Sequence, residues 1–124
     1  MTAWTADEIS AIGGSDELDL ASLRPDGTLR AFVTMWVVRS GDDLYVRSAY
    51  GPDNPWFARA LRSGTGRIRA GGLEADVRFE EPATTLADQI SAAYHAKYDR
   101  FGARMLGTVV SPEAARSTLR LVRR

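Results

Sequence analysis

The residues best suited to chemistry in this 124-residue chain lie between Leu44 and Arg59. That segment reads LYVRSAYGPDNPWFAR, which predicts a strand, then a loop rich in Gly, Pro and Asn, and then a helix. We expect Asn54 to be the N-cap of the helix and Pro55 its first residue. Arginines, hydroxyl groups and free helix N–H groups would then surround one concavity. Such an arrangement favours an anionic group, most often a phosphate.

The candidate anion site draws its members from all three parts of this segment. Arg47 and Ser48 would end the strand, Gly51 would let a ligand approach the backbone closely, and Arg59 would lie a turn into the helix. The full set is Arg47, Ser48, Tyr50, Gly51, Asn54 and Arg59. The alternative is that Arg47 is a solvated strand residue and that Asn54-Pro55 merely begins a helix.

Two tryptophans flank this segment in the expected fold. Trp36 lies on the longest predicted strand and Trp56 in the first turn of the helix. Either indole could stack on a flat ring or pack in the core or in a subunit interface. Arg24, beside a Pro-Asp-Gly turn, could also reach an anion, although arginines next to turns are usually solvated.

Composition excludes several classes of site. The chain has no cysteine, which excludes thiol catalysis, disulfides and zinc–thiolate sites, and its only histidine is His95. Sixteen basic and sixteen acidic residues give a net charge of zero, which argues against binding to nucleic acid or to an anionic membrane. No apolar run approaches about 18 residues and no signal peptide is recognisable, so we expect a cytoplasmic protein.

Hydrophobic patterning predicts one α+β domain over residues 1–124, built as a small antiparallel β-barrel of about six strands with crossing helices. The expected strands cover residues 17–22, 29–39, 44–48, 67–70, 73–80 and 118–122. The expected helices cover residues 5–12, 55–63 and 85–101, the last capped by Thr85 with Asp88. A helical turn is expected at 112–116, while the pattern between 102 and 112 gives no clear assignment.

Four segments resemble an uncharacterised bacterial family of about this length. They are an RPDG turn between strands, WVVRSGDDLYVRS, GPxxxWFxR and GxGRIxAGGxxxDVxF. That family looks like a branch of the pyridoxamine-phosphate-oxidase-like split β-barrels, which bind flavin mononucleotide (FMN) or deazaflavin. The resemblance covers roughly Leu18 to Phe79 and the C-terminal strand.

The resemblance implies a flavin- or deazaflavin-dependent oxidoreductase that acts on a small organic molecule. The positions matching the family's phosphate-holding groups are Arg47, Ser48, Tyr50 and Arg59, and those matching its ring neighbours are Thr34 and Trp36. The family's lysine after the hydroxyl segment is absent, and Trp56 stands near its place. The resemblance also implies a homodimer with two cofactor sites at its interface.

Other readings of the sequence remain open. The first is a cofactor-free split barrel that binds a ligand or a partner protein. The second is a small cone-shaped cyclase or isomerase, against which the early strand hairpins and the lone His95 count. If a redox cofactor binds, it carries the hydride chemistry, and Tyr50, Tyr94 or Tyr98 could donate a proton.

Overall fold

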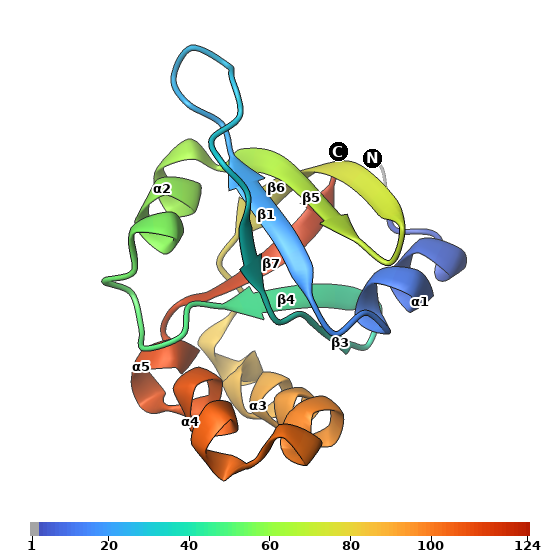
Figure 1. The fold of residues 1–124 in the computed structure, drawn as a ribbon, viewed down its shortest axis with the longest axis vertical. Helices are drawn as coiled ribbons and strands as arrows, with labels where there is room; N and C mark the ends of the chain where they lie inside the picture. Colours follow the sequence, from blue (N-terminus) through green and yellow to red (C-terminus); the bar gives the residue numbers. More distant parts are fainter. Residues whose placement is uncertain (1–2) are drawn as a thin grey trace.

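Seven antiparallel strands form one curled sheet in the computed structural model, which describes residues 3–124 (Figure 1). The strands are β1 (Leu18–Ser22), β2 (Val33–Met35), β3 (Val38–Ser40), β4 (Asp43–Arg47), β5 (Thr65–Ala70), β6 (Leu73–Glu80) and β7 (Thr118–Arg123). The helices are α1 (Ala6–Gly13), α2 (Pro55–Ser63), α3 (Ala87–Tyr98), α4 (Ala103–Val110) and α5 (Pro112–Ala115). The predicted α+β antiparallel split barrel is confirmed, with one strand more than expected.

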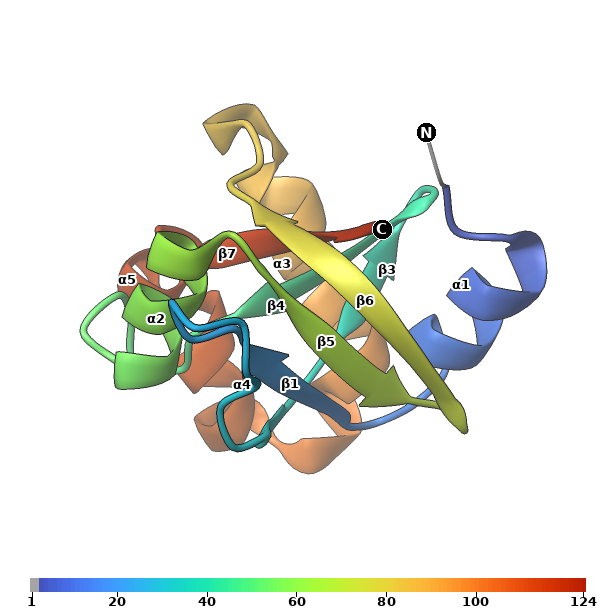
Figure 2. The same cartoon turned by 90° about the horizontal axis from the view of Figure 1, so that it is seen from above.

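The sheet curls because one chain segment supplies both of its edges. The strand order is β2-β1-β5-β6-β7-β4-β3, so β2 and β3 lie at opposite ends of the sheet. Only Trp36 and Val37 separate these two strands along the chain. Seen from above, β5 and β6 cross in front of β4 and β7, with α3 behind them (Figure 2).

The prediction of a single strand over residues 29–39 is wrong. The chain is extended there but breaks at Val37, whose N–H donates to the Tyr98 hydroxyl (3.1 Å) and whose carbonyl accepts from Lys97 Nζ (2.6 Å). Helix α3 therefore supplies the backbone partners that a continuous ladder would have supplied. Burial also changes along this segment, since Val33 is 36% exposed whereas Val37 is fully buried.

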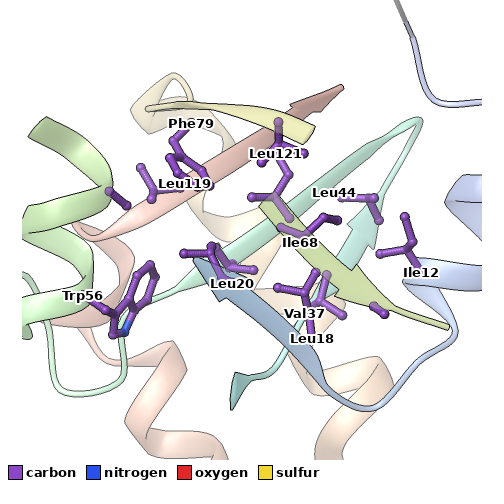
Figure 3. Close-up of a cluster of buried hydrophobic side chains, with 14 of the residues drawn as sticks. Ile12, Leu18, Leu20, Val37, Leu44, Trp56, Ile68, Phe79, Leu119 and Leu121 are labelled. Atoms are coloured by element: carbon purple, nitrogen blue, oxygen red, sulfur yellow. The ribbon is translucent and has the colours of Figure 1, made fainter. Parts of the chain in front are cut away.

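The barrel interior holds the main hydrophobic core. It contains Leu18 and Leu20 from β1, Ile68 from β5 and Leu119 and Leu121 from β7, and Figure 3 shows them pointing toward one another. On β6, Val77 and Phe79 are buried and Asp76 and Arg78 are exposed, whereas Leu73 at the start of the strand is 38% exposed. A second cluster, built from Val38, Tyr45, Ile90, Tyr94, Tyr98, Leu106 and Val109, joins α3 and α4 to the strands β3 and β4.

The ends of the first two helices follow the predicted capping residues. Thr5 and Glu8 form a reciprocal capping box at the start of α1, with bonds of 2.9 and 3.1 Å. Asn54 is the N-cap of α2 and Pro55 its first residue, and the helix ends at Gly64, which adopts a left-handed conformation (φ 74°). In Figure 1, α2 lies at one end of the sheet and α1 at the other.

Helix α3 begins differently from the prediction. A 3-10 turn at Thr84–Leu86 precedes it, and no side chain caps its first residue, so the expected cap by Thr85 and Asp88 is wrong. A second 3-10 turn, Asp99–Phe101, follows α3 and leads into α4. Within residues 3–124 no helix combines the length and the apolar character needed to span a bilayer.

Candidate functional site

A cavity of about 340 Å³ opens between the barrel wall, the start of α2 and helix α4. It brings together five of the nine residues predicted for the site, namely Thr34, Trp36, Arg47, Asn54 and Trp56. Its remaining lining is Glu17, Val33, Met35, Ala49, Met105, Thr108 and Val109. The volume falls in the ordinary range of ligand sites, about 300–1,000 Å³. We call this space the tryptophan cavity.

Arg47, at the end of β4, is the basic residue of the tryptophan cavity, which Glu17 also lines, and Arg47 is only 2% exposed. Its guanidinium donates to four oxygens. Nε donates to Thr118 Oγ1 (2.9 Å), Nη1 to Ser91 Oγ (2.8 Å) and to the Val109 carbonyl (3.0 Å), and Nη2 to the Ala87 carbonyl (2.9 Å). Since a guanidinium has five N–H groups, one is left for a ligand. Arg47 therefore cannot form a two-pronged fork with a phosphate in this arrangement.

The charge of Arg47 is not neutralised by an acid in the described chain. All four of its acceptors are neutral, and no carboxylate lies within ion-pair distance of it. Burial lowers the pKa of Arg47, and the charge interaction with Tyr94, whose ring centroid lies 5.5 Å from Cζ, acts in the opposite sense. A buried cation without a counter-ion creates a positive potential, which attracts an anionic group to the adjoining cavity.

The two tryptophans of the tryptophan cavity belong to different hydrophobic clusters. Trp56 points from α2 into the barrel core, as Figure 3 shows, and is 8% exposed. Trp36 packs against the second cluster and stacks on Tyr98, with ring centroids 4.1 Å apart and planes within 3° of parallel. Both indoles therefore have a packing role as well as a place on the cavity wall, and each offers apolar surface to a flat ring.

Asn54 and Thr34 are two of the polar side chains on this wall. The Asn54 side chain makes no capping hydrogen bond to α2, so its amide remains available to a ligand. The Thr34 hydroxyl donates to Asp19 Oδ1 (2.6 Å), which fixes its orientation on β2. The cavity thus combines apolar ring surface, one uncommitted amide and one buried positive charge, with the exposed carboxylate of Glu17 also on its wall.

The other four predicted residues lie outside the tryptophan cavity. Ser48 is fully buried and its hydroxyl donates to the Gly51 carbonyl (2.6 Å), which closes the loop after β4. Gly51 has φ 107°, and a Cβ there would come within 2.9 Å of Glu113 Cβ. Tyr50 is 81% exposed, also with a positive φ (68°), and Arg59 lines a separate pocket. The predicted single concavity is therefore divided between different surfaces.

The sequence prediction missed the residues of α4. Met105, Thr108 and Val109 line the tryptophan cavity, but residues 102–112 carried no assignment. The signal was present: Leu106, Val109 and Val110 recur at helical spacing, and Ser111-Pro112 marks a boundary between two helices. Two Gly residues within this short stretch obscured it, because Gly is a poor helix former.

No tyrosine proposed as a proton donor lines this cavity in the described chain. The Tyr98 hydroxyl is occupied by Val37 and by the carbonyl of Asp16 (2.8 Å). The Tyr94 hydroxyl is fully buried without a hydrogen-bond partner, and burial raises its pKa strongly. Among residues 3–124 no cluster of three acidic or histidine side chains could hold a metal ion.

Solved structures share this fold at low sequence identity. The protein Atu2129 of unknown function from Agrobacterium tumefaciens strain C58 aligns over 96% of this chain with a TM-score of 0.64 and 12% identity. This chain covers 53% of that protein and so spans about half its length. An F420 reductase aligns with a TM-score of 0.55 and 19% identity, covering 94% of this chain and 90% of the reductase.

A FAD-binding protein from Mesorhizobium loti also shares the fold, with a TM-score of 0.58 and 17% identity over 99% of this chain and 92% of its own. Such identities establish a common fold and nothing finer. Comparison with functionally curated proteins gives no match. Residues 8–121 match a family model described as "Uncharacterized protein conserved in bacteria (DUF2255)", and the chain belongs to this family.

Proposed function

We propose that the protein is an oxidoreductase that binds a flavin or deazaflavin in the tryptophan cavity. The observation that carries this proposal is the buried Arg47 guanidinium, which lacks a carboxylate partner in the described chain and adjoins a cavity bordered by two indoles. A flat ring with an anionic arm matches both features. The F420 reductase and the FAD-binding protein that share the fold support the same class of cofactor.

The residues of this chain would hold and orient the cofactor. Trp36 and Trp56 offer apolar surface to a ring, and the free amide of Asn54 offers both a donor and an acceptor. The charge on Arg47 would favour the anionic part of the molecule and any negative charge that develops beside it. When bound, the cofactor supplies the hydride chemistry for a small organic substrate.

The test is a titration of the purified protein with FMN, riboflavin and a deazaflavin, followed by absorbance and fluorescence. Asn54→Asp is the informative variant because it keeps the size of the side chain and removes no capping bond, so the fold is preserved while a negative charge enters the cavity. We expect it to weaken FMN binding by about tenfold, through repulsion of the phosphate, and to change riboflavin binding little. Gln89→Glu, an exposed position on α3, adds the same charge elsewhere and should leave both affinities unchanged.

Two results would contradict this assignment. If none of the three compounds binds saturably, the cofactor-free ligand- or partner-binding barrel is the better description. If Asn54→Asp weakens FMN and riboflavin equally, the phosphate does not lie beside Arg47 and α2.

We extend the proposal to a homodimer that completes the site. Apolar side chains gather beside the tryptophan cavity, where Val33 is 36% exposed and Met105 55% exposed, and Phe101 next to Trp36 is 44% exposed. A second copy of the chain would cover this surface. Light scattering of the samples used for the titration gives the mass in solution, and a monomer at all concentrations would refute this part.

A further inference from the structure

A second pocket, separate from the tryptophan cavity, is lined by four arginines and no acidic residue. It has a volume of about 450 Å³ and lies between α2 and the loop that joins β1 to β2. In Figure 1 this loop extends past the end of the sheet, on the side where α2 lies. Arg24 and Arg30 come from the loop, and Arg59 and Arg62 from α2. We call it the arginine pocket.

The four arginines differ from most others on this surface. None of them forms an ion pair with a carboxylate in the described chain. By contrast, ion pairs involve Arg39, Arg67, Arg69, Arg78, Arg100, Arg120 and Arg123. Asp26 interacts with Arg24 through its charge, but the four like charges that line one pocket still repel one another, and an anion between them would reduce that repulsion.

The loop side of the pocket is held in place by its own hydrogen bonds. Arg24 Nη1 donates to the Leu29 carbonyl (2.7 Å) and to Thr28 Oγ1 (3.3 Å), which leaves Nε and Nη2 uncommitted. The nearby acid, Asp26, accepts from the Thr28 N–H (3.0 Å) and hydroxyl (2.6 Å), and these bonds lower its pKa. Its carboxylate is thus occupied within the turn and does not line the pocket.

Arg30 provides an independent indication of a ligand. Its Nε is shielded from solvent and has no hydrogen-bond acceptor in the described chain. A buried donor without a partner is unfavourable, and a small number of such groups in native proteins mark sites where a bound group supplies the partner.

We propose that the arginine pocket binds the phosphoryl or pyrophosphoryl group of a small molecule. Each guanidinium presents a planar fork of donors, and a pyrophosphate has enough oxygens to accept from several forks at once, whereas a single carboxylate has only two. The site is a bounded concavity on a chain of net charge zero, which fits a compact anion better than the extended backbone of a nucleic acid. This site lies outside the proposed redox cavity and does not depend on it.

The experiment is a calorimetric titration with pyrophosphate and with inorganic phosphate at constant ionic strength. We expect saturable binding that is tighter for pyrophosphate. Arg30→Gln and Arg62→Gln should each weaken it by at least about tenfold, since each removes charge-assisted hydrogen bonds. Arg62 is exposed, so this variant tests the site even if Arg30→Gln does not fold. Arg116→Gln, an exposed arginine outside the pocket, is the matched control and should bind like the wild type.

Three outcomes would overturn the proposal. The first is the absence of saturable binding of either anion to the wild-type protein. The second is a loss of affinity in a variant outside the pocket. An equal loss in Arg116→Gln would mean diffuse electrostatic attraction, and a loss in Asn54→Asp would mean binding in the tryptophan cavity. The third is tighter binding of a short single-stranded oligonucleotide than of pyrophosphate in the same titration, which would make the pocket part of a nucleic-acid surface.

Discussion

Replacing Arg47 by methionine tests whether one buried cation holds the helices against the barrel. Methionine has a similar length but removes the charge and all five donors. The guanidinium links β4 to the Ala87 carbonyl of α3, to the Val109 carbonyl of α4 and to Thr118 of β7. The Val109 carbonyl lies in the last turn of α4, where carbonyls have no partner within the helix. Arg47 therefore both caps α4 and opposes the negative end of its dipole.

The size of the effect follows from these contacts. Each hydrogen bond from a charged donor contributes about 1.5–3 kcal/mol, but methionine also removes the cost of burying the charge. The substitution leaves neutral buried acceptors without their donor, which costs about 1–3 kcal/mol. We expect Arg47→Met to lower the free energy of unfolding by that amount, out of the roughly 5–15 kcal/mol that a domain of this kind possesses.

Urea denaturation followed by circular dichroism measures this change. An unchanged m value, the slope of the free energy of unfolding against urea concentration, would show that unfolding remains cooperative. Arg104→Met is the control because Arg104 lies on α4 itself but is exposed, so its free energy of unfolding should change by no more than about 0.5 kcal/mol. If Arg47→Met costs less than about 1 kcal/mol, or no more than the control, the network does not hold the helices and the reasoning is refuted.

Two further predictions concern stability. Gly66→Ala should destabilise the protein by about 1–3 kcal/mol or more, because the new Cβ would lie 2.1 Å from a carbonyl oxygen of β1 and 2.8 Å from Phe79 Cζ. Gly107→Ala on α4 meets nothing within 4 Å and should instead stabilise the helix, and chemical denaturation of both variants compares them. Burial lowers the pKa of Lys97 from 10.5 to about 8 and raises that of Tyr98 from 10.0 to about 12. Above about pH 8, unfolding takes up a proton at Lys97, so the free energy of unfolding should rise with pH. Above about pH 10, unfolding releases a proton from Tyr98, so the free energy of unfolding should then fall. Denaturation at a series of pH values checks this, and the rise should disappear in Lys97→Met; its persistence there would contradict the assignment.

The elements that the sequence predicted well are those with strong local signals. Helix α2 has both ends where Pro55 and Gly64 indicate them, and β6 runs over the predicted residues because its apolar side chains alternate without interruption. The capping box of α1 is likewise a contact between residues three positions apart. In each case the residues that decide the structure are neighbours in the chain.

The elements that the sequence predicted wrongly depend on residues far away in the chain. The break at Val37 depends on Tyr98 and Lys97, which lie about sixty positions later in the sequence, as their separations of 61 and 60 show. The segment from Leu29 to Arg39 is rich in β-branched and aromatic residues and carries no trace of those partners. The start of α3 differs for a related reason, since its 3-10 turn needs no side-chain cap and so leaves no capping signal to read.

The predictions for the candidate site also succeeded where the signal is local and failed where the contacts are distant in sequence. The sequence correctly placed Asn54 and Trp56 on the first turn of α2, because the helix start is a local feature. It also placed Arg47 at the end of a strand, but it could not show that the side chain turns inward to meet acceptors between 40 and 71 positions away. Arg59 was assigned to the same concavity on the basis of chain proximity, yet it lines the arginine pocket.

The inward orientation of Arg47 changes what this residue can contribute to binding. A solvated arginine binds an anion through direct hydrogen bonds, because water and salt screen most of its electrostatic attraction at longer distance. A buried one, with four of its donors committed to the protein, acts mainly through its charge, which the surrounding apolar cluster screens far less. The direct contacts to a ligand must then come from neighbours that are free to make them, and the uncommitted amide of Asn54 meets this requirement. Arg47 contacts α3 and α4 and also lines the cavity beside α4, so we expect stability and ligand charge preference to be coupled through this side chain.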